Sequence, residues 1–133
     1  MIVGAGLAGL SSAVSAAEQK DTKVVVVEKT ASWVGRGGGI GVIESRLTRK
    51  LGIKNDKEEI AREWMALCGN RANEKLVWLF LNKSGEAMDW FLDKADAMKL
   101  PCVIWGGYYN GATYREHPGY HMFMGGPQLP ALQ

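Results

Sequence analysis

Cysteine and long apolar runs are scarce in this sequence, and each scarcity excludes a class of protein. The cysteines, Cys68 and Cys102, lie far apart and outside any CxxC motif. Such a pair does not make the disulfide framework of a small secreted domain, so we expect buried, reduced thiols in a cytoplasmic protein. No stretch is long and apolar enough to cross a bilayer as a helix, so no membrane segment is expected.

An excess of charge of one sign is also missing. The chain has 16 lysines and arginines against 14 aspartates and glutamates, which gives a formal net charge of +2, and the two signs are interspersed. This pattern does not resemble the basic surface of a nucleic-acid-binding protein. No nucleic acid partner is therefore expected.

Histidine is equally sparse, with only His117 and His121, whose roles the sequence leaves open. Their spacing would suit a metal site on a helix, but Pro118 and Gly119 between them oppose a helix. No cysteine or carboxylate cluster in the sequence completes a ligand set, so we expect no metal site. An exposed polar loop is the favoured interpretation of residues 115–117.

Glycine is abundant instead, with 17 among 133 residues, nearly twice the average of about 7%. The length fits one domain or part of one. The first cluster, Gly4-x-Gly6-x-x-Gly9, follows apolar residues 1–3 and opens a stretch of small residues, Leu7–Lys20, that is typical of a helix. The next segment, Lys23–Glu28, contains consecutive valines typical of a strand buried on both faces of a parallel sheet. This order predicts a βαβ unit with parallel strands.

The glycine spacing predicts a dinucleotide-binding turn. Gly4 permits the tight turn, Gly6 lets the backbone approach a pyrophosphate, and Gly9 allows the helix to pack closely on the sheet. Backbone N–H groups at the start of the helix then face the phosphates. The expected phosphate-binding residues are therefore Gly4, Ala5, Gly6, Leu7, Ala8 and Gly9.

An acidic residue is expected about 20 positions after such a turn, at the end of the second strand. Glu28 stands 28 − 9 = 19 positions after Gly9 and is followed by Lys29, and both are assigned to the expected site. The Glu28 carboxylate would accept hydrogen bonds from ribose hydroxyls and would repel a 2′-phosphate. The inferred ligand is adenosine diphosphate without a 2′-phosphate.

A second glycine cluster, Ser32–Gly41, follows this unit directly. From Ile2 to Gly41 the sequence closely resembles the flavoprotein family of fumarate reductases, succinate dehydrogenase flavoprotein subunits and 3-ketosteroid dehydrogenases, and it does so more loosely to about Met98. The resemblance implies noncovalent FAD, because members that link FAD covalently use a histidine in this second loop and none is present here. It also implies backbone contacts with the flavin's pyrophosphate and ribityl chain from Arg36, Gly37, Gly38, Gly39 and Ile40.

The expected fold class is α/β: a Rossmann-like FAD-binding βαβ unit with parallel strands, followed by a helical segment, in an incomplete domain. Residues 1–41 hold the βαβ unit and the glycine-rich loop, 42–100 the helical segment, and 101–133 a loop-rich tail. Apolar periodicity predicts helices with core-facing stripes over Asp56–Cys68, Asn73–Asn82 and Ser84–Met98, and a short strand over Cys102–Trp105. The tyrosines are expected to pack under glycine turns, namely Tyr108, Tyr109, Tyr114 and Tyr120.

Three functions stay open. The favoured one is the FAD-binding portion of a flavin-dependent oxidoreductase that acts, in its complete form, on a small-molecule substrate. An NAD-binding Rossmann protein is the alternative, although it would need alternating strands and helices after Gly41, and a noncatalytic truncated remnant is the third. The resemblance implies a substrate-capping domain and a C-terminal segment that completes the FAD site. Because 133 residues do not contain them, we expect an N-terminal piece that is inactive alone, and no catalytic residue is identified.

Overall fold

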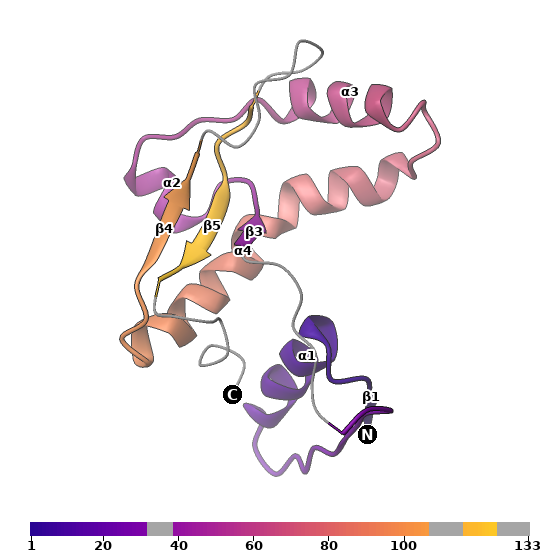
Figure 1. Cartoon of the computed structure of the whole chain (residues 1–133), viewed down its shortest axis with the longest axis vertical. Coiled ribbons are helices and arrows are strands. Elements are labelled where there is room, and N and C mark those ends of the chain that lie inside the picture. The colour runs from indigo at the N-terminus through magenta and orange to yellow at the C-terminus, as the bar shows by residue number, and fades with distance from the viewer. Residues whose placement is uncertain (32–38, 107–115, 125–133) are drawn as a thin grey trace. The chain divides into compact units, whose positions relative to one another are not determined.

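The structure is a computed structural model that describes residues 1–31, 39–106 and 116–124 (Figure 1). The chain divides into two units, one formed by Met1–Gly37 with Gly126–Gln133 and the other by Gly38–Gly125. We call them unit 1 and unit 2 and describe each by itself. Arg36, Gly37 and Gly38 of the expected site, and three of the tyrosines, lie outside the described residues.

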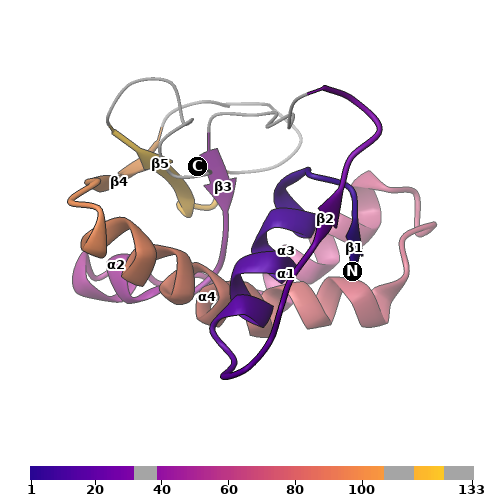
Figure 2. The same ribbon diagram turned by 90° about the horizontal axis from the view of Figure 1, so that it is seen from below.

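Unit 1 is a βαβ unit made of β1 (Ile2–Val3), α1 (Leu7–Ala17) and β2 (Val26–Val27) (Figure 2). The strands pair in parallel, with Ile2 opposite Val26 and Val3 opposite Val27. The amide of Gly4 extends the pairing by donating to the Val27 carbonyl at 2.7 Å. The predicted parallel βαβ unit is therefore confirmed, although the helix ends earlier than Lys20.

The prediction that the valine strand is buried on both faces is wrong for this chain. Val25 and Val27 keep 60% and 47% of their surface exposed, and Val3 keeps 77%. The alternate residues Val24 and Val26 are half-buried. The reason is that, among the described residues, this sheet has two strands and α1 packs against one face, so side chains alternate between that face and solvent.

Unit 2 contains an antiparallel sheet that the sequence revealed only in part. Its strands are β3 (Gly39–Gly41), β4 (Cys102–Trp105) and β5 (Tyr120–Phe123), in the order β3-β5-β4. β4 was predicted and is confirmed. β3 was assigned to the glycine-rich loop and β5 to a loop-rich tail, and both assignments are wrong because these short strands form through pairing with each other across the chain.

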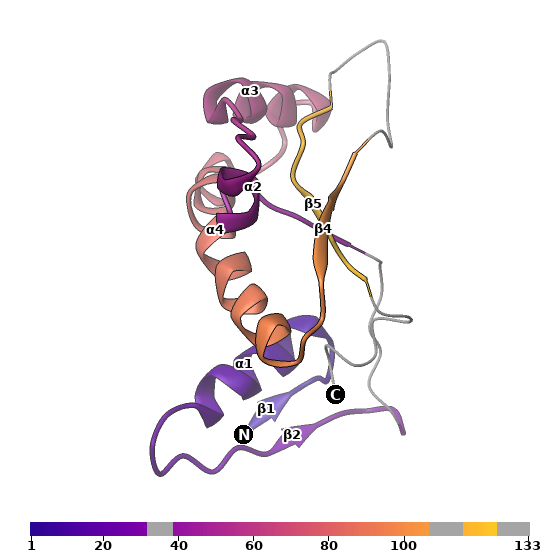
Figure 3. The same ribbon diagram turned by 90° about the vertical axis from the view of Figure 1, so that its left-hand side faces the viewer.

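The helices of unit 2 are α2 (Arg46–Lys50), which was not predicted, α3 (Lys57–Leu67) and α4 (Glu74–Ala97) (Figure 3). α3 begins where expected, because the Asp56 carboxylate accepts hydrogen bonds from the amides of Glu58 and Glu59 at 2.9 and 3.0 Å. Asn73 caps α4 in the same way, through a 3.1 Å bond from the Lys75 amide.

α4 is one continuous helix of 24 residues where two separate helices were predicted. The break was placed near Ser84 and Gly85, which are poor helix formers. Instead, the Ser84 hydroxyl accepts a 3.0 Å hydrogen bond from the Ile43 amide. A Cβ at Gly85 would lie 2.4 Å from the Ile43 carbonyl oxygen, so glycine allows the segment before α2 to cross the helix closely. Both residues contact the crossing segment, and neither ends the helix.

The core of unit 2 consists of two groups of side chains along α4. One joins α3 to α4 and contains Ile43, Ile60, Ala61, Val77 and Leu81. The other contains Val42, Met88 and Leu92, with Ile40 and Phe123 of the sheet packed against it. The predicted apolar stripes are thus confirmed as core at Ile60, Val77, Leu81, Met88 and Leu92, whereas Leu67 and Leu76 of the same stripes are exposed.

The two thiols are free, as expected, but they are not both buried. Cys68 is exposed at the end of α3, while Cys102 is half-buried in β4. Burial raises the pKa of the Cys102 thiol to about 11. In the part of the chain that the structure describes, no helix has the length and apolar character needed to cross a membrane.

Candidate functional site: the glycine turn of unit 1

The three glycines of the turn between β1 and α1 have different surroundings. Gly4 has a φ of +99°, which a side chain disfavours. A Cβ at Gly9 would lie 1.9 Å from the Gly4 carbonyl oxygen, so the helix reaches the turn only because that Cβ is missing. A Cβ at Gly6 would meet no described atom within 4 Å, so this position faces open space.

The start of α1 presents backbone donors to that space. Gly6 is the N-cap residue and has no side chain to accept from the first amides of the helix. The first intrahelical bond is donated by the Leu10 amide to the Gly6 carbonyl at 2.9 Å. The amides of Leu7, Ala8 and Gly9 precede it and therefore have no partner within the helix. Such a helix start attracts anions.

Glu28 lies directly beside this turn. One oxygen of its carboxylate accepts a 2.6 Å hydrogen bond from the Ala5 amide, and the other accepts from the Thr30 amide at 3.1 Å. These bonds, the Ala5 bond most strongly, hold the pKa of Glu28 below its usual value, so the carboxylate is ionised at neutral pH. The contact with Ala5 joins the glycine turn to the acidic residue that follows the second strand, and this contact was not predicted. Lys29 is exposed.

The described residues of the second glycine cluster belong to unit 2. Gly39 packs against an aromatic ring, because a Cβ there would lie 2.4 Å from Cε1 of Tyr120. The prediction that tyrosines pack under glycines is confirmed for Tyr120. The Ile40 side chain packs against the core. The glycine at position 39 is therefore accounted for by Tyr120 without any ligand.

Ser45 and His121 form a buried polar pair that the sequence did not reveal. Both side chains are fully buried, and the Ser45 hydroxyl lies 2.6 Å from Nε2 of His121. Nδ1 of His121 lies 2.7 Å from the Gly119 carbonyl, which only accepts, so Nδ1 carries the proton. Burial lowers the pKa of His121, so the neutral ring accepts the Ser45 hydrogen. The pair fastens β5 to the start of α2.

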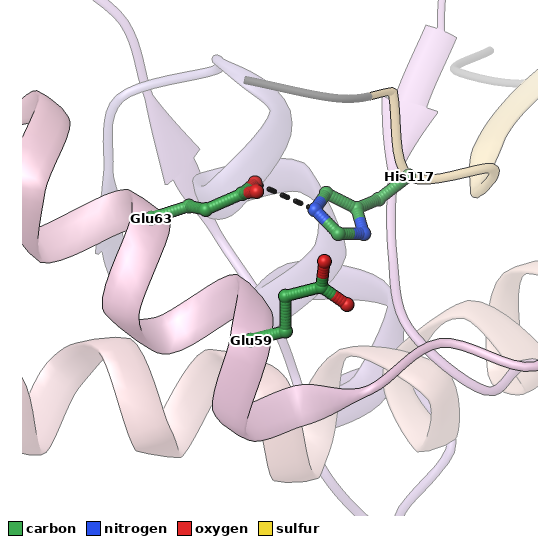
Figure 4. Close-up of side chains that lie close together, drawn as sticks. All are labelled: Glu59, Glu63 and His117. Atoms are coloured by element: carbon green, nitrogen blue, oxygen red, sulfur yellow. Dashed lines mark hydrogen bonds and ion pairs between the residues drawn. The ribbon is translucent and has the colours of Figure 1, made fainter. Parts of the chain in front are cut away.

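His117 is also less exposed than the loop interpretation predicted. Its side chain is 14% exposed, and Nε2 lies 2.7 Å from a carboxylate oxygen of Glu63. Glu59, one turn earlier on α3, completes a group whose potential ligand atoms all lie within 4.8 Å of one another (Figure 4). The expectation that no carboxylate cluster accompanies the histidines is wrong. No local motif signals this group, because 54 positions separate His117 from Glu63.

Comparison with known protein families shows the class of protein to which this chain belongs. The FAD binding domain family matches residues 1–125, and the chain belongs to this family. FAD is the cofactor of the family, which agrees with the predicted cofactor.

Among curated proteins, the NADH:fumarate oxidoreductase of Klebsiella pneumoniae (strain 342) is 28% identical over 90% of this chain and 13% of its own length. Two proteins of Mycolicibacterium smegmatis (strain ATCC 700084 / mc(2)155) are similar as well. Its KsdD-like steroid dehydrogenase is 28% identical over 97% of this chain and 26% of its own length. Its 3-oxosteroid 1-dehydrogenase is 29% identical over 90% of this chain and 21% of its own length.

These relatives confirm the resemblance to the fumarate reductase and steroid dehydrogenase group. The chain spans between 13% and 26% of the length of the curated relatives that it matches. Their names are those of oxidoreductases, so the chain is related to oxidoreductases at the level of the family.

Proposed function

We propose that unit 1 binds the ADP moiety of FAD, as the FAD-binding portion of a flavin-dependent oxidoreductase. The observation that carries the proposal is the 2.6 Å bond between the Glu28 carboxylate and the Ala5 amide. It brings the acidic group and the open donors of the glycine turn to one place, and these are the two features that an ADP moiety requires.

The pyrophosphate would lie at the start of α1, over Gly6. The amides of Leu7, Ala8 and Gly9 would donate to its oxygens, and the helix dipole would favour its negative charge. The missing Cβ of Gly6 leaves the space that the phosphates need.

The ribose would lie at Glu28. A carboxylate oxygen accepts along two directions, so the oxygen bonded to the Ala5 amide keeps one direction for a ribose hydroxyl. Because hydrogen bonds keep this carboxylate ionised, a 2′-phosphate on the ribose would meet a negative charge. The turn would therefore prefer FAD or NAD-type ribose over its 2′-phosphorylated form, and family membership favours FAD.

The remaining parts of the proposal rest on the family resemblance. Residues 36–40 would contact the cofactor through their backbone, FAD would be bound noncovalently, and Lys29 would lie near the adenosine. When bound, FAD supplies the redox chemistry, while residues of this chain bind and orient it. In this proposal the complete protein acts on a small-molecule substrate, as the names of its relatives suggest, and this chain alone is inactive.

A titration of the isotope-labelled chain with ADP, followed by amide NMR, tests the proposal. We expect shifts of the amides of residues 4–9 and of Glu28, and at least tenfold weaker binding of ADP that carries an added 2′-phosphate. Shifts confined to unit 2, or equal affinity for both nucleotides, would overturn the proposed site. A folded chain that binds neither ADP nor FAD at millimolar concentration would favour the noncatalytic remnant.

Covalent attachment is tested separately. If the chain loaded with FAD is denatured in acid, all flavin should separate from the polypeptide. Flavin absorbance that remains with the protein would contradict noncovalent binding.

A further inference from the structure

Glu59, Glu63 and His117 form a compact group in unit 2, and the proposed function uses none of these three residues. The two glutamates lie one turn apart on α3 and reach toward the same imidazole ring (Figure 4). One nitrogen and two carboxylate oxygens within 4.8 Å of one another are a set of atoms that can converge on a single ion.

The segment that carries His117 is held in place by neighbouring backbone. The Asn55 side chain, just before α3, donates a 2.7 Å hydrogen bond to the Pro118 carbonyl. The Val42 amide donates a 3.0 Å bond to the Gly119 carbonyl, and a Cβ at Gly119 would lie 2.4 Å from the Val42 carbonyl oxygen. His117 is thus fixed opposite α3 by contacts that involve neither glutamate, which is the preorganisation that a ligand site needs.

The charges of the group favour a cation. Two glutamates at i and i+4 on a helix repel each other, and a cation bound between them would relieve this repulsion. In addition, Nδ1 of His117 is buried and has no hydrogen-bond partner among the described residues. Within the described residues the ring is therefore held by one hydrogen bond, whereas a purely structural histidine usually has a pair.

We propose that Glu59, Glu63 and His117 bind a divalent first-row transition metal ion such as Zn²⁺. Imidazole suits zinc, cobalt, nickel and iron, and carboxylates complete such sites. A ligand set of three leaves a further position for water or another ligand. Mg²⁺, which takes oxygen ligands and keeps several waters, fits this set poorly.

The ion replaces the hydrogen bond between Glu63 and His117. Ligands of tetrahedral zinc with bonds of about 2.0–2.1 Å lie about 3.3 Å apart. The present separation of 2.7 Å therefore opens by about 0.6 Å. To bind the metal, Nε2 must give up the proton of this hydrogen bond, which passes to Nδ1 of the same ring or to solvent.

Zinc titration of the full chain by calorimetry tests the proposal, with Co²⁺ absorbance as a second readout. The background carries Cys68→Ser, because Cys68 is an exposed thiol and a possible competing ligand. Glu59→Gln, Glu63→Gln and His117→Asn remove one ligand each. Glu58→Gln is the matched control, since Glu58 and Glu59 both lie in the first turn of α3 and only Glu59 belongs to the group.

We expect one Zn²⁺ per chain, at least tenfold weaker binding in each of the three ligand variants, and unchanged binding in Glu58→Gln. Zn²⁺ should also raise the melting temperature of the parent chain and not that of the ligand variants. Mg²⁺ should produce neither effect at the same concentration.

Glu59→Gln keeps the test decisive if another variant fails to fold, because it leaves the bond between Glu63 and His117 intact. Circular dichroism checks the fold of each protein first. Equal affinity in Glu59→Gln and the parent, or loss of zinc binding through Cys68→Ser alone, would overturn the proposal. Absence of binding at millimolar Zn²⁺ would overturn it as well. None of these results depends on whether unit 1 binds FAD.

Discussion

The glycines of the turn in unit 1 offer a test that separates folding from binding. Gly9→Ala places a Cβ 1.9 Å from the Gly4 carbonyl oxygen, whereas real Cβ contacts stay beyond 3.0 Å. The turn and α1 must therefore separate by at least 3.0 − 1.9 = 1.1 Å. Gly6→Ala makes no contact within 4 Å of any described atom. The first substitution should damage the fold of unit 1, and the second should damage only ligand binding.

The expected size of the Gly9→Ala effect follows from two opposing terms. Overpacking costs about 1–3 kcal/mol, and the clash with rigid backbone lies at the upper end. Alanine in place of glycine within a helix returns about 1 kcal/mol. A net loss of about 1–2 kcal/mol should speed the amide exchange of α1 by roughly 5- to 30-fold.

Gly6→Ala has small and opposing effects on stability. Alanine is a poorer N-cap residue than glycine, but it reduces the entropy of the unfolded chain, and each term is at most about 1 kcal/mol. The φ of −82° at Gly6 is compatible with alanine. Its Cβ, however, occupies the space proposed for the pyrophosphate, so the affinity for ADP should fall more than tenfold.

Hydrogen exchange of α1 and ADP titration by NMR measure both variants. Gly9→Ala exchange rates equal to those of the parent chain would show that α1 does not depend on the missing Cβ. Undiminished ADP binding by Gly6→Ala would show that the phosphates lie elsewhere. Either result would refute the assignment of separate roles to these glycines.

Three further outcomes are expected. Glu28→Ala should weaken ADP binding by roughly tenfold to a hundredfold, the effect of losing a charge-assisted hydrogen bond, and isothermal calorimetry with Glu58→Ala as control measures it. Gly85→Ala should lower the melting temperature of unit 2 although alanine has the better helix propensity, because a Cβ would lie 2.4 Å from the Ile43 carbonyl oxygen. An unchanged or raised melting temperature in thermal denaturation would contradict the close crossing of α4 by residues 43–44. Burial lowers the pKa of His121, so the unfolded chain binds a proton at this histidine more readily than the folded chain does. The free energy of unfolding should therefore be full above about pH 6.5 and fall as the pH drops below it. Urea titrations at several pH values measure this, and the free energy of unfolding of His121→Gln should depend less on pH.

The features predicted correctly are those that short stretches of sequence encode. The βαβ unit and the start of α3 depend on residues that are close in sequence. Even the separate roles of Gly4 and Gly9 follow from the glycine motif, and the structure agrees with them.

The errors fall where contacts between distant segments override local preference. Two helices were predicted, with a break between Asn82 and Ser84, yet the crossing of residues 43–44 explains Ser84 and Gly85 inside one helix. β3 has three residues, two of them glycine, and β5 directly follows Pro118 and Gly119 in a stretch without a clear period, so only their pairing defines them. The Ser45–His121 bond spans 76 positions, so no spacing rule predicts it.

The half-covered sheet of unit 1 has a practical consequence for anyone who produces this chain. Val25 and Val27 present an exposed apolar face, and consecutive valines form a short segment of high β-propensity without charge. Segments of this kind pair with their copies in other molecules and seed aggregation. Lys23 on one side and Glu28 with Lys29 on the other are charged flanks that oppose such stacking.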